Sequence, residues 1–348
     1  MSGNAARAML NVRAGVKSTN EGESRTSEKE MGVTKMQRLP ESPALSTAQA
    51  MALTCGRTYR KAIKGIFDNR ELVLNEVVDG ELVQGTFKGL SSEVLSQKIL
   101  SSVRAVYGMG LMGDGEAVNY EELRTSPEFQ AFQADVQMLW GVDPMEMDVR
   151  ARKAFFLNIY NALVIHGIIV GGKPETATER MHFYSRTAYA IGGRVYTLND
   201  IEHGVLRSNR MSWQPIPVKP FSEYDTRLKC AVPLDPRVHF ALNCGAKGCP
   251  NLRFYESENL DEALDLATRA FLRDVYIDEA QGMVVISSIF SWYLGDFAAD
   301  HQELLRWIFP FLTAENQRRL SALSEFMAKN GYGEVIVGFG TYDWSVNE

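Results

Sequence analysis

The sequence predicts an α+β fold, mainly helical with a small antiparallel sheet, in a single large domain after a disordered N-terminus. Three observations lead to this prediction. Apolar residues at helical spacing dominate the first half of the chain beyond residue 45. Short β-prone runs such as "AYAIGGRVYTL" are concentrated in the second half. Residues 1–45 are rich in polar residues and poor in aromatics, so they bury too little surface to offset chain entropy.

Three parts are therefore expected along the chain: a disordered leader at 1–45, a helical part at 46–145 packed on the core, and the core itself at 146–348. The first twenty residues hold three basic and no acidic residue, and they lack the apolar stretch of a secretory signal. A transit peptide is the alternative reading of this leader. The expected location is accordingly the cytoplasm, with organellar import as the alternative.

The composition of the 348-residue chain is that of an ordinary globular protein, with 45% hydrophobic and 23% charged residues. A net charge of −6 gives no general attraction to nucleic acid, and no nucleic-acid partner is expected. No transmembrane segment is expected, because asparagines and a histidine interrupt the most apolar run, "AFFLNIYNALVIHGIIVGG". Four cysteines do not make a disulfide scaffold in a chain this long, which favours a reducing compartment.

Capping signals place the helices of the first half. A helix is expected from Ser46, followed by a hairpin around "VVDGELVQGTF". The next helix, "SSEVLSQKILSSVRAVYG", begins at Ser91 or Ser92, and another begins at Ser126-Pro127 with proline in its first turn. The long apolar helix that follows is capped by Asp148 and stops at Gly171-Gly172.

The second half mixes strands and helices. "AYAIGGRVYTL" predicts a hairpin, "TLNDIEHGVLRSNR" a short capped helix and "RVHFALNC" a strand. "LDEALDLATRAFLRDV" is an amphipathic helix, and "GMVVISSIFSWYLGDF" starts as a strand and ends in a turn or helix. Two further helices precede a β-like end, "GEVIVGFGTYDWSVN".

The stretch "HFALNCGAKGCPNL" is the first candidate site. Alternation along the expected strand sends His239 and Cys244 to opposite faces, so a partnership requires the turn at Gly245 or another histidine. A cysteine nucleophile needs an imidazole and amide donors, and the "CGAKGC" turn could supply the amides of an oxyanion hole. The spacing does not match common zinc modules. A Cys244–Cys249 disulfide, or two inert thiols in a buried turn, remain alternatives.

Two other segments carry polar side chains that need partners. In "NDIEHGVLRSNR", His203 and Arg207 share a helix face, and Glu202 lies about 100° round from His203. In "FFLNIYNALVIH", Asn158 and Asn161 lie on one face of an apolar helix, where they would brace a loop or orient a reacting group.

Together these segments resemble domain-of-unknown-function family 547 (DUF547). The resemblance rests on "KAFFLNIYNALVIHG", "YTLNDIEHGVLR", "DPRVHFALNCGAKGCPNLRFY", "IFSWYLGDF" and "YDWSVN" in this order, and it covers roughly residues 75–348. Family members usually read "FWINLYNA" and "CGAxSCPPL", so Phe156, Gly248 and Asn251 depart from the pattern. The resemblance implies the motif positions Asn158, Asn161, Glu202, His203, Arg207, His239, Cys244 and Cys249, but no established activity.

The leading hypothesis is a cysteine-dependent hydrolase or acyltransferase, although the sequence does not decide whether the protein is an enzyme. Cys244 would be the nucleophile with Cys249 as the alternate, His239 or His203 the base, and Glu202 or Asn158 its orienting group. Arg207 and Asn161 would bind substrate, a small molecule or peptide.

Two other classes remain open. One is a zinc-binding domain with His203, His239, Cys244 and Cys249 as ligands, although no cofactor is expected. The other is a non-catalytic module that binds a protein partner.

Overall fold

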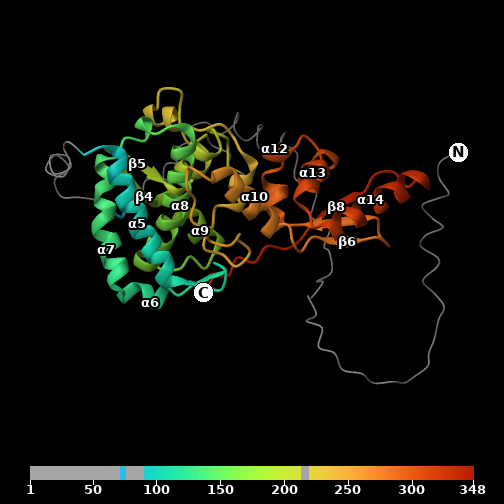
Figure 1. The fold of residues 1–348 in the computed structure, drawn as a ribbon, viewed down its shortest axis with the longest axis horizontal. Coiled ribbons are helices and arrows are strands. Elements are labelled where there is room, and N and C mark those ends of the chain that lie inside the picture. Colours follow the sequence, from blue (N-terminus) through green and yellow to red (C-terminus); the bar gives the residue numbers. More distant parts are fainter. Residues whose placement is uncertain (1–70, 76–89, 213–218) are drawn as a thin grey trace, which may run out of the picture. The chain divides into compact units, whose positions relative to one another are not determined.

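The computed structural model describes residues 71–75, 90–212 and 219–348 (Figure 1). The predicted leader, the helix from Ser46 and the hairpin at "VVDGELVQGTF" lie outside the described residues. The described part is α+β and mainly helical, as predicted.

The helices begin and end where the capping signals indicate. Ser91 caps α5, Ser126 caps α7 with Pro127 in its first turn, and Asp148 caps α8, which stops at Gly171. The α-helices are α5 Ser92–Gly110, α6 Tyr120–Thr125, α7 Pro127–Asp135, α8 Val149–Gly171, α9 Ala177–Arg186, α10 Leu260–Phe271, α11 Ser288–Trp292, α12 Leu294–Phe297, α13 His301–Ile308 and α14 Ala314–Lys329.

Short helical turns of other types connect them. The 3₁₀ turns are η1 Val136–Gly141, η2 Pro144–Glu146, η4 Thr226–Cys230, η5 Pro236–Phe240 and η6 Phe309–Phe311, and η3 Asp200–Leu206 is a π-helix. The helix predicted in "TLNDIEHGVLRSNR" is therefore present, but as a π-helix, whose turns are wider than those of an α-helix. π-Helical segments are frequent at functional sites.

The strands form three small sheets, ordered β1-β4-β5, β2-β3 and β6-β7-β8. The hairpins β2-β3, β4-β5 and β6-β7 are antiparallel, whereas β1-β4 and β7-β8 are parallel pairs. The strands are β1 Leu72–Val73, β2 Leu111–Met112, β3 Ala117–Val118, β4 Thr187–Ile191, β5 Arg194–Thr197, β6 Tyr276–Asp278, β7 Met283–Ile286 and β8 Ile336–Phe339.

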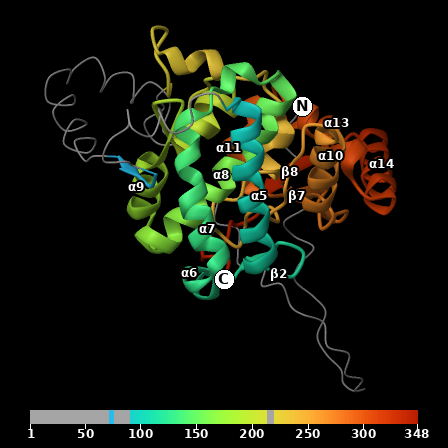
Figure 2. The ribbon, with the colours of Figure 1, turned by 60° about the vertical axis from the view of Figure 1, so that its left-hand side comes forward.

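Helix α8 is the centre of the first of two hydrophobic clusters. By length and composition α8 could cross a membrane, but 89% of its apolar window is buried inside the fold. Helices α5 and α7 run side by side next to it (Figure 2). The sequence prediction of a buried core helix is thus confirmed.

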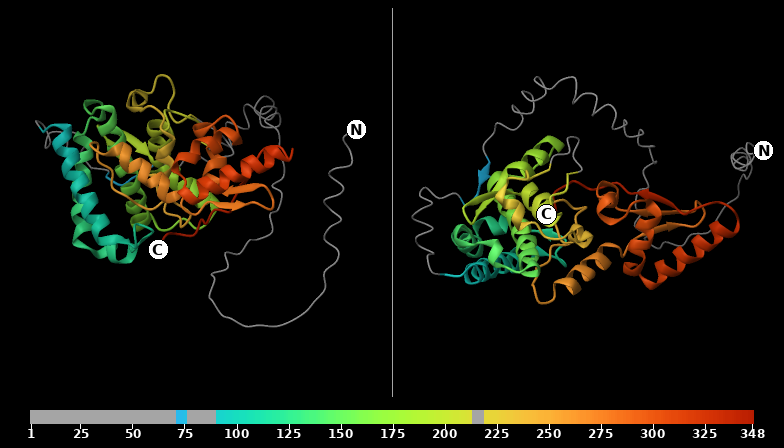
Figure 3. Two further views of the ribbon diagram at one scale, coloured as in Figure 1. Left: turned by 45° about the vertical axis from the view of Figure 1, so that its right-hand side comes forward. Right: turned by 90° about the horizontal axis from the view of Figure 1, so that it is seen from above.

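The second hydrophobic cluster joins η5 and α10 to the elements from β6 to β8. In Figure 3 α14 lies beside the strands of this C-terminal part. The segment after η5 passes between the two clusters, because Phe240 belongs to the second and Ala241 and Leu242 belong to the first. This crossing segment leads directly to Cys244.

The strand predicted at "RVHFALNC" is wrong. Pro236 occupies the first turn of η5, and the Asp235 side chain accepts the amide hydrogen of Arg237, so a helical turn begins where a strand was expected. The apolar run misled the prediction because short apolar segments do not distinguish buried strands from buried helical turns. The inference that alternation separates His239 from Cys244 therefore fails, and both residues reach one cavity.

Candidate functional site

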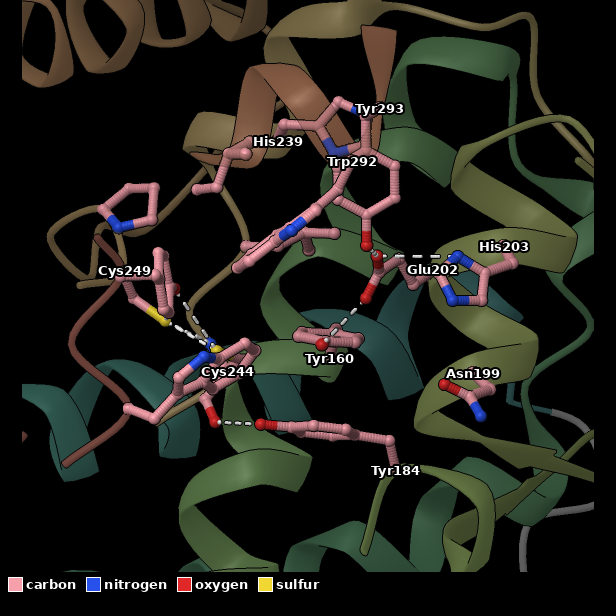
Figure 4. Close-up of a pocket in the computed structure, with 15 residues that line it drawn as sticks. Tyr160, Tyr184, Asn199, Glu202, His203, His239, Cys244, Cys249, Trp292 and Tyr293 are labelled. Carbon is pink, nitrogen blue, oxygen red and sulfur yellow. Dashed lines mark hydrogen bonds and ion pairs between the residues drawn. The ribbon is translucent and has the colours of Figure 1, made fainter. Parts of the chain in front are cut away.

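A cavity of about 80 Å³ lies where α8, η3, η5, α11 and the C-terminal segment meet (Figure 4). Five of the residues predicted for the site line it: Glu202, His203, His239, Cys244 and Cys249. Its other lining residues are Tyr160, Tyr184, Asn199, Leu242, Pro250, Ile289, Trp292, Tyr293, Tyr342 and Trp344. The structure therefore brings together side chains from segments far apart in sequence.

Two cysteine sulfurs form one side of the cavity. The Sγ atoms of Cys244 and Cys249 lie 2.7 Å apart, and both cysteines are free thiols. The backbone N–H of Cys244 and the Tyr342 hydroxyl each donate to the Cys249 sulfur at 3.1 Å. The Tyr342 oxygen also lies 3.6 Å from the Cys244 sulfur.

The two thiols differ in acidity. The hydrogen bond from Cys249 lowers the pKa of Cys244 to about 7, against the opposing effect of burial, and Tyr342 and the Ala246 amide add to the stabilisation of the thiolate. Burial, followed by the hydrogen bond to Cys244, raises the pKa of Cys249. The proton of the hydrogen bond between the two sulfurs therefore stays on Cys249. A large fraction of Cys244 is in the thiolate form at neutral pH.

The amides of the "CGAKGC" turn are used within the fold. Gly245 adopts φ +85°, and a Cβ there would lie 2.8 Å from the Ile168 side chain, so this turn requires glycine. The amides of Lys247 and Gly248 donate to the C-terminal segment at Ser345 and Asp343. The amides of this turn are thus bonded to the cysteine sulfurs and to the C-terminal segment. They do not form the oxyanion hole that the sequence led us to expect.

The two asparagines of α8 each clamp a buried piece of backbone. Asn161 donates to the carbonyl of Ala241 and accepts from the amide of Asn243, at 2.9 Å in both cases. Asn158 makes the same pair of contacts with both backbone groups of Tyr255. Among the described residues neither asparagine lines the cavity or hydrogen-bonds to a histidine. Asn161 therefore positions the segment that leads to Cys244, while Asn158 braces a different loop.

Glu202 faces the cavity from η3 with two phenols on its carboxylate. The Tyr293 hydroxyl donates to Oε1 at 2.6 Å and the Tyr160 hydroxyl to Oε2 at 3.0 Å. Burial opposes ionisation, but His203, the Tyr293 hydroxyl and Arg207 together hold the pKa of Glu202 below its usual value. Glu202 is thus an ionised carboxylate on the cavity wall.

His203 is neutral and its Nδ1 is already bonded. Arg207 has only donors, so its Nη1 at 3.0 Å from His203 Nδ1 makes this nitrogen an acceptor and places the ring hydrogen on Nε2. Burial lowers the pKa of His203 to about 4. The same arginine binds Asp296 through Nε at 2.6 Å and Nη2 at 3.1 Å and donates to the carbonyl of Met211. Arg207 is therefore committed to the interior and does not line the cavity.

His239 is held by a carboxylate that the sequence did not single out. Its Nε2 lies 2.8 Å from Asp296 Oδ2, and its ring stacks on Tyr293 at a centroid distance of 4.0 Å. Burial would raise the pKa of Asp296, but hydrogen bonds from His239 and Arg207 outweigh it and hold this pKa well below the usual range. Burial also lowers the pKa of His239. The neutral imidazole therefore donates from Nε2 and leaves Nδ1 as a free acceptor among the described residues.

No direct pairing of thiol and imidazole is formed among the described residues. Within the described ranges no histidine nitrogen makes a hydrogen bond to either sulfur, and Figure 4 shows His203 and the sulfur pair at opposite ends of the cavity. The same ranges contain no group of three or more His, Cys, Asp or Glu side chains that could hold a metal ion. The four residues of the zinc hypothesis thus line one cavity without forming a metal-binding cluster.

Several site residues were missed from sequence: Tyr160, Tyr184, Trp292, Tyr293, Asp296, Tyr342 and Trp344. Asp296 and Tyr293 stand in the quoted "IFSWYLGDF", and Tyr160 stands between the two asparagines. A polar residue within an otherwise apolar motif was the available signal for Asp296. Tyr184, whose hydroxyl donates to the Cys244 carbonyl at 3.0 Å, had no such signal.

Comparison with known proteins identifies the segment that carries most of this site. Residues 144–272 match the family model described as "Protein of unknown function, DUF547". No curated protein and no solved structure matches the chain. The matched segment contains Glu202, His203, His239 and both cavity cysteines, while Tyr293, Asp296 and Tyr342 follow it. Residues 144–272 are therefore similar to the DUF547 family, in agreement with the resemblance of the motifs.

Proposed function

We propose that the protein is a cysteine-dependent hydrolase or acyltransferase in which the Cys244 thiolate is the nucleophile. The supporting observation is the cavity-facing sulfur pair, in which a neighbouring thiol lowers the pKa of Cys244 to about 7. A thiolate present at neutral pH needs no base to deprotonate it before attack. This removes the requirement for a histidine in contact with the sulfur.

The remaining groups have complementary roles in the proposed reaction. The Cys244 sulfur forms a bond to the acyl carbon, and the leaving group departs with the proton of the Cys249 thiol. His239 then takes a proton at Nδ1 from the water or acceptor that attacks the thioester, which releases Cys244 as a thiolate. The proton on His239 finally returns to Cys249. Asp296 holds His239 in the tautomer that this second step needs.

The test is trapping of an acyl-enzyme. The full-length protein is mixed with p-nitrophenyl acetate at pH 7, and acetylated residues are identified by peptide mass spectrometry. We expect one acetyl group on Cys244, and a loss of about 10³-fold or more in the burst rate for Cys244→Ser. Cys230→Ser is the matched control, because this thiol is buried outside the cavity. Equal labelling in Cys244→Ser would refute the proposal.

A second candidate, thiol–disulfide exchange, is favoured by the 2.7 Å separation of the sulfurs. Cys244 would attack a disulfide substrate, release one thiol and form a mixed disulfide, which Cys249 would resolve as an internal disulfide. Cys249→Ser separates the two functions, since serine keeps a hydrogen-bond donor but cannot form a disulfide. Acylation by p-nitrophenyl acetate, whose leaving group needs no proton from Cys249, should largely survive this change, whereas disulfide exchange should stop at a stable mixed disulfide.

A further inference from the structure

The cavity wall that surrounds Glu202 is aromatic and carries negative charge. Six of the lining side chains are aromatic: Tyr160, Tyr184, Trp292, Tyr293, Tyr342 and Trp344. The described lining residues include no lysine and no arginine, while Glu202 is ionised and Cys244 is partly so at neutral pH. The electrostatic potential inside the cavity therefore favours a cation.

Among the described residues no arginine or lysine forms an ion pair with Glu202, and Arg207 acts on this carboxylate only at a distance. Arg207 and Arg210, which follow Glu202 in the same segment, both bind Asp296. His203 Nδ1 lies 3.5 Å from Oε1, but this nitrogen accepts a hydrogen from Arg207 and the ring is neutral. Glu202 is thus a largely buried carboxylate whose bonded partners are two neutral phenols.

Such a carboxylate can still accept further hydrogen bonds. An ionised carboxylate offers about four acceptor positions, and the phenols of Tyr160 and Tyr293 occupy one on each oxygen. Burial of a charge is costly unless a counter-charge compensates it. A ligand with positively charged N–H donors would supply both the missing hydrogen bonds and the missing charge.

The aromatic rings around Glu202 are suited to the same ligand, because ring faces attract cations. Two rings of this cavity already have guanidinium groups near them: Arg180 lies 5.0 Å from the centre of Trp344, and Arg207 lies 4.5 Å from that of Tyr293. A cavity of about 80 Å³ admits only a small head group.

We propose that the cavity binds the primary ammonium group of a substrate, with Glu202 as its counter-ion and hydrogen-bond acceptor and the surrounding aromatic side chains as its walls. This inference rests on the proposed function, since it names the class of substrate that Cys244 acts on. It makes Glu202 a substrate-binding residue rather than the group that orients the base. The ammonium group and the Cys244 sulfur then occupy the same cavity.

The test compares probes of one length and different charge. Propylammonium, 1-propanol and propyltrimethylammonium are titrated at pH 7 into reduced full-length protein with the Cys244→Ser change, and binding is followed by saturation-transfer NMR. We expect propylammonium to bind at least about tenfold more tightly than 1-propanol, which is about 1.4 kcal/mol. Propyltrimethylammonium should also bind more weakly than propylammonium, because it has no N–H donor.

Variants locate the site of binding. Glu202→Gln should weaken propylammonium binding at least about tenfold and leave 1-propanol unchanged. Glu325→Gln, a change on the exposed face of α14, should alter neither. Equal affinity for propylammonium and 1-propanol would overturn the inference, and so would full affinity in a folded Glu202→Gln variant. If Glu202→Gln does not fold, the probe series alone decides.

These outcomes are independent of the acylation experiment. Ammonium selectivity without acetylation of Cys244 would support the binding site and contradict the proposed reaction. Acetylation of Cys244 without ammonium selectivity would support the reaction and overturn the substrate class.

Discussion

The two sides of the cavity are built in different ways. The sulfur side, formed by Cys244, Cys249 and Tyr342, is half-buried and is held mainly by backbone amides of a turn and by the C-terminal segment. The network side, formed by Glu202, His203, Arg207, His239 and Asp296, consists of side chains bonded to one another in the interior.

Because of this difference, we expect the sulfur side to determine thiol reactivity and the network side to support the fold. The half-buried sulfurs can be reached by a reactant, and their acidity depends on each other. The network side contributes charge and fixed tautomers, and removal of Asp296 leaves the charge of Arg207 unpaired in the interior. Changes on the network side should therefore act mainly on stability, and changes on the sulfur side mainly on thiol chemistry.

The largest effect is expected for Asp296→Ala. This change leaves Arg207 buried without its carboxylate and should lower the free energy of unfolding by about 3–5 kcal/mol. Denaturant unfolding measures the loss. Arg210→Ala is the matched control, because its side chain is 46% exposed and its ion pair with the same carboxylate should be worth about 1 kcal/mol or less. Equal losses in both variants would contradict the description of the network side.

The two asparagines of α8 provide a further test of how the backbone near Cys244 is positioned. Asn161→Ala and Asn158→Ala each leave a buried amide and a buried carbonyl without partners, so each should cost about 2–4 kcal/mol in stability. Only Asn161→Ala should also change the pH dependence of Cys244 alkylation, because Asn161 holds the backbone at Ala241 and Asn243. An equal change in alkylation for Asn158→Ala would show that Asn161 has no specific positioning role.

The network side should be sensitive to acid. In the unfolded chain His203 takes a proton below pH 6.5, but in the folded protein its pKa is about 4. Between these values the unfolded state binds more protons, so this contribution to stability is complete above pH 6.5 and declines as the pH falls toward 4. The slope is at most about 1.4 kcal/mol per pH unit for one histidine.

His203→Gln should remove this part of the slope in denaturant unfolding measured across the interval. His166 provides a control away from the cavity, since burial lowers its pKa to about 4 as well and its Nδ1 is bonded to the Tyr189 hydroxyl. His166→Gln should flatten the stability curve similarly and leave cavity binding unchanged. A slope unaltered in His203→Gln would mean that this imidazole is not the neutral group described above.

The smallest effect on stability is expected on the sulfur side. Cys249→Ala removes the thiol that donates to Cys244, so the pKa of Cys244 should rise from about 7 toward the ordinary cysteine value of about 8.5. The rate of iodoacetamide alkylation against pH reports this shift, with peptide mapping to assign Cys244. Cys249→Ser keeps a donor and should shift the profile less. An unchanged profile in Cys249→Ala would show that the two thiols do not interact.

Local signals predicted most of the helices but only part of the site. Ser91, Ser126 and Asp148 act on amides within three residues, so their effect is visible in sequence. The same local chemistry at Asp235 and Pro236 marked a helical turn, but the apolar run that follows was read as a strand.

Long-range partnerships were not visible in sequence. Asp296 binds a histidine 57 positions away and an arginine 89 positions away, and no local pattern specifies such pairs. The resemblance between motifs indicated that Glu202, His203, His239 and the two cysteines belong together. The geometry then placed Asp296 on His239, and Cys249 rather than a histidine beside Cys244.

The attachment of the "CGAKGC" turn to residues 343–347 has a consequence for biosynthesis. The turn pairs with this segment through the Ala246–Val346 bridge, and Asn347 is buried against Tyr120, with its oxygen accepting from the phenol at 2.7 Å. During translation the cysteines emerge about a hundred residues before these partners. The acidic thiol thus acquires its final surroundings only when residue 347 has left the ribosome, so a nascent chain does not yet hold Cys244 in the environment of the folded protein.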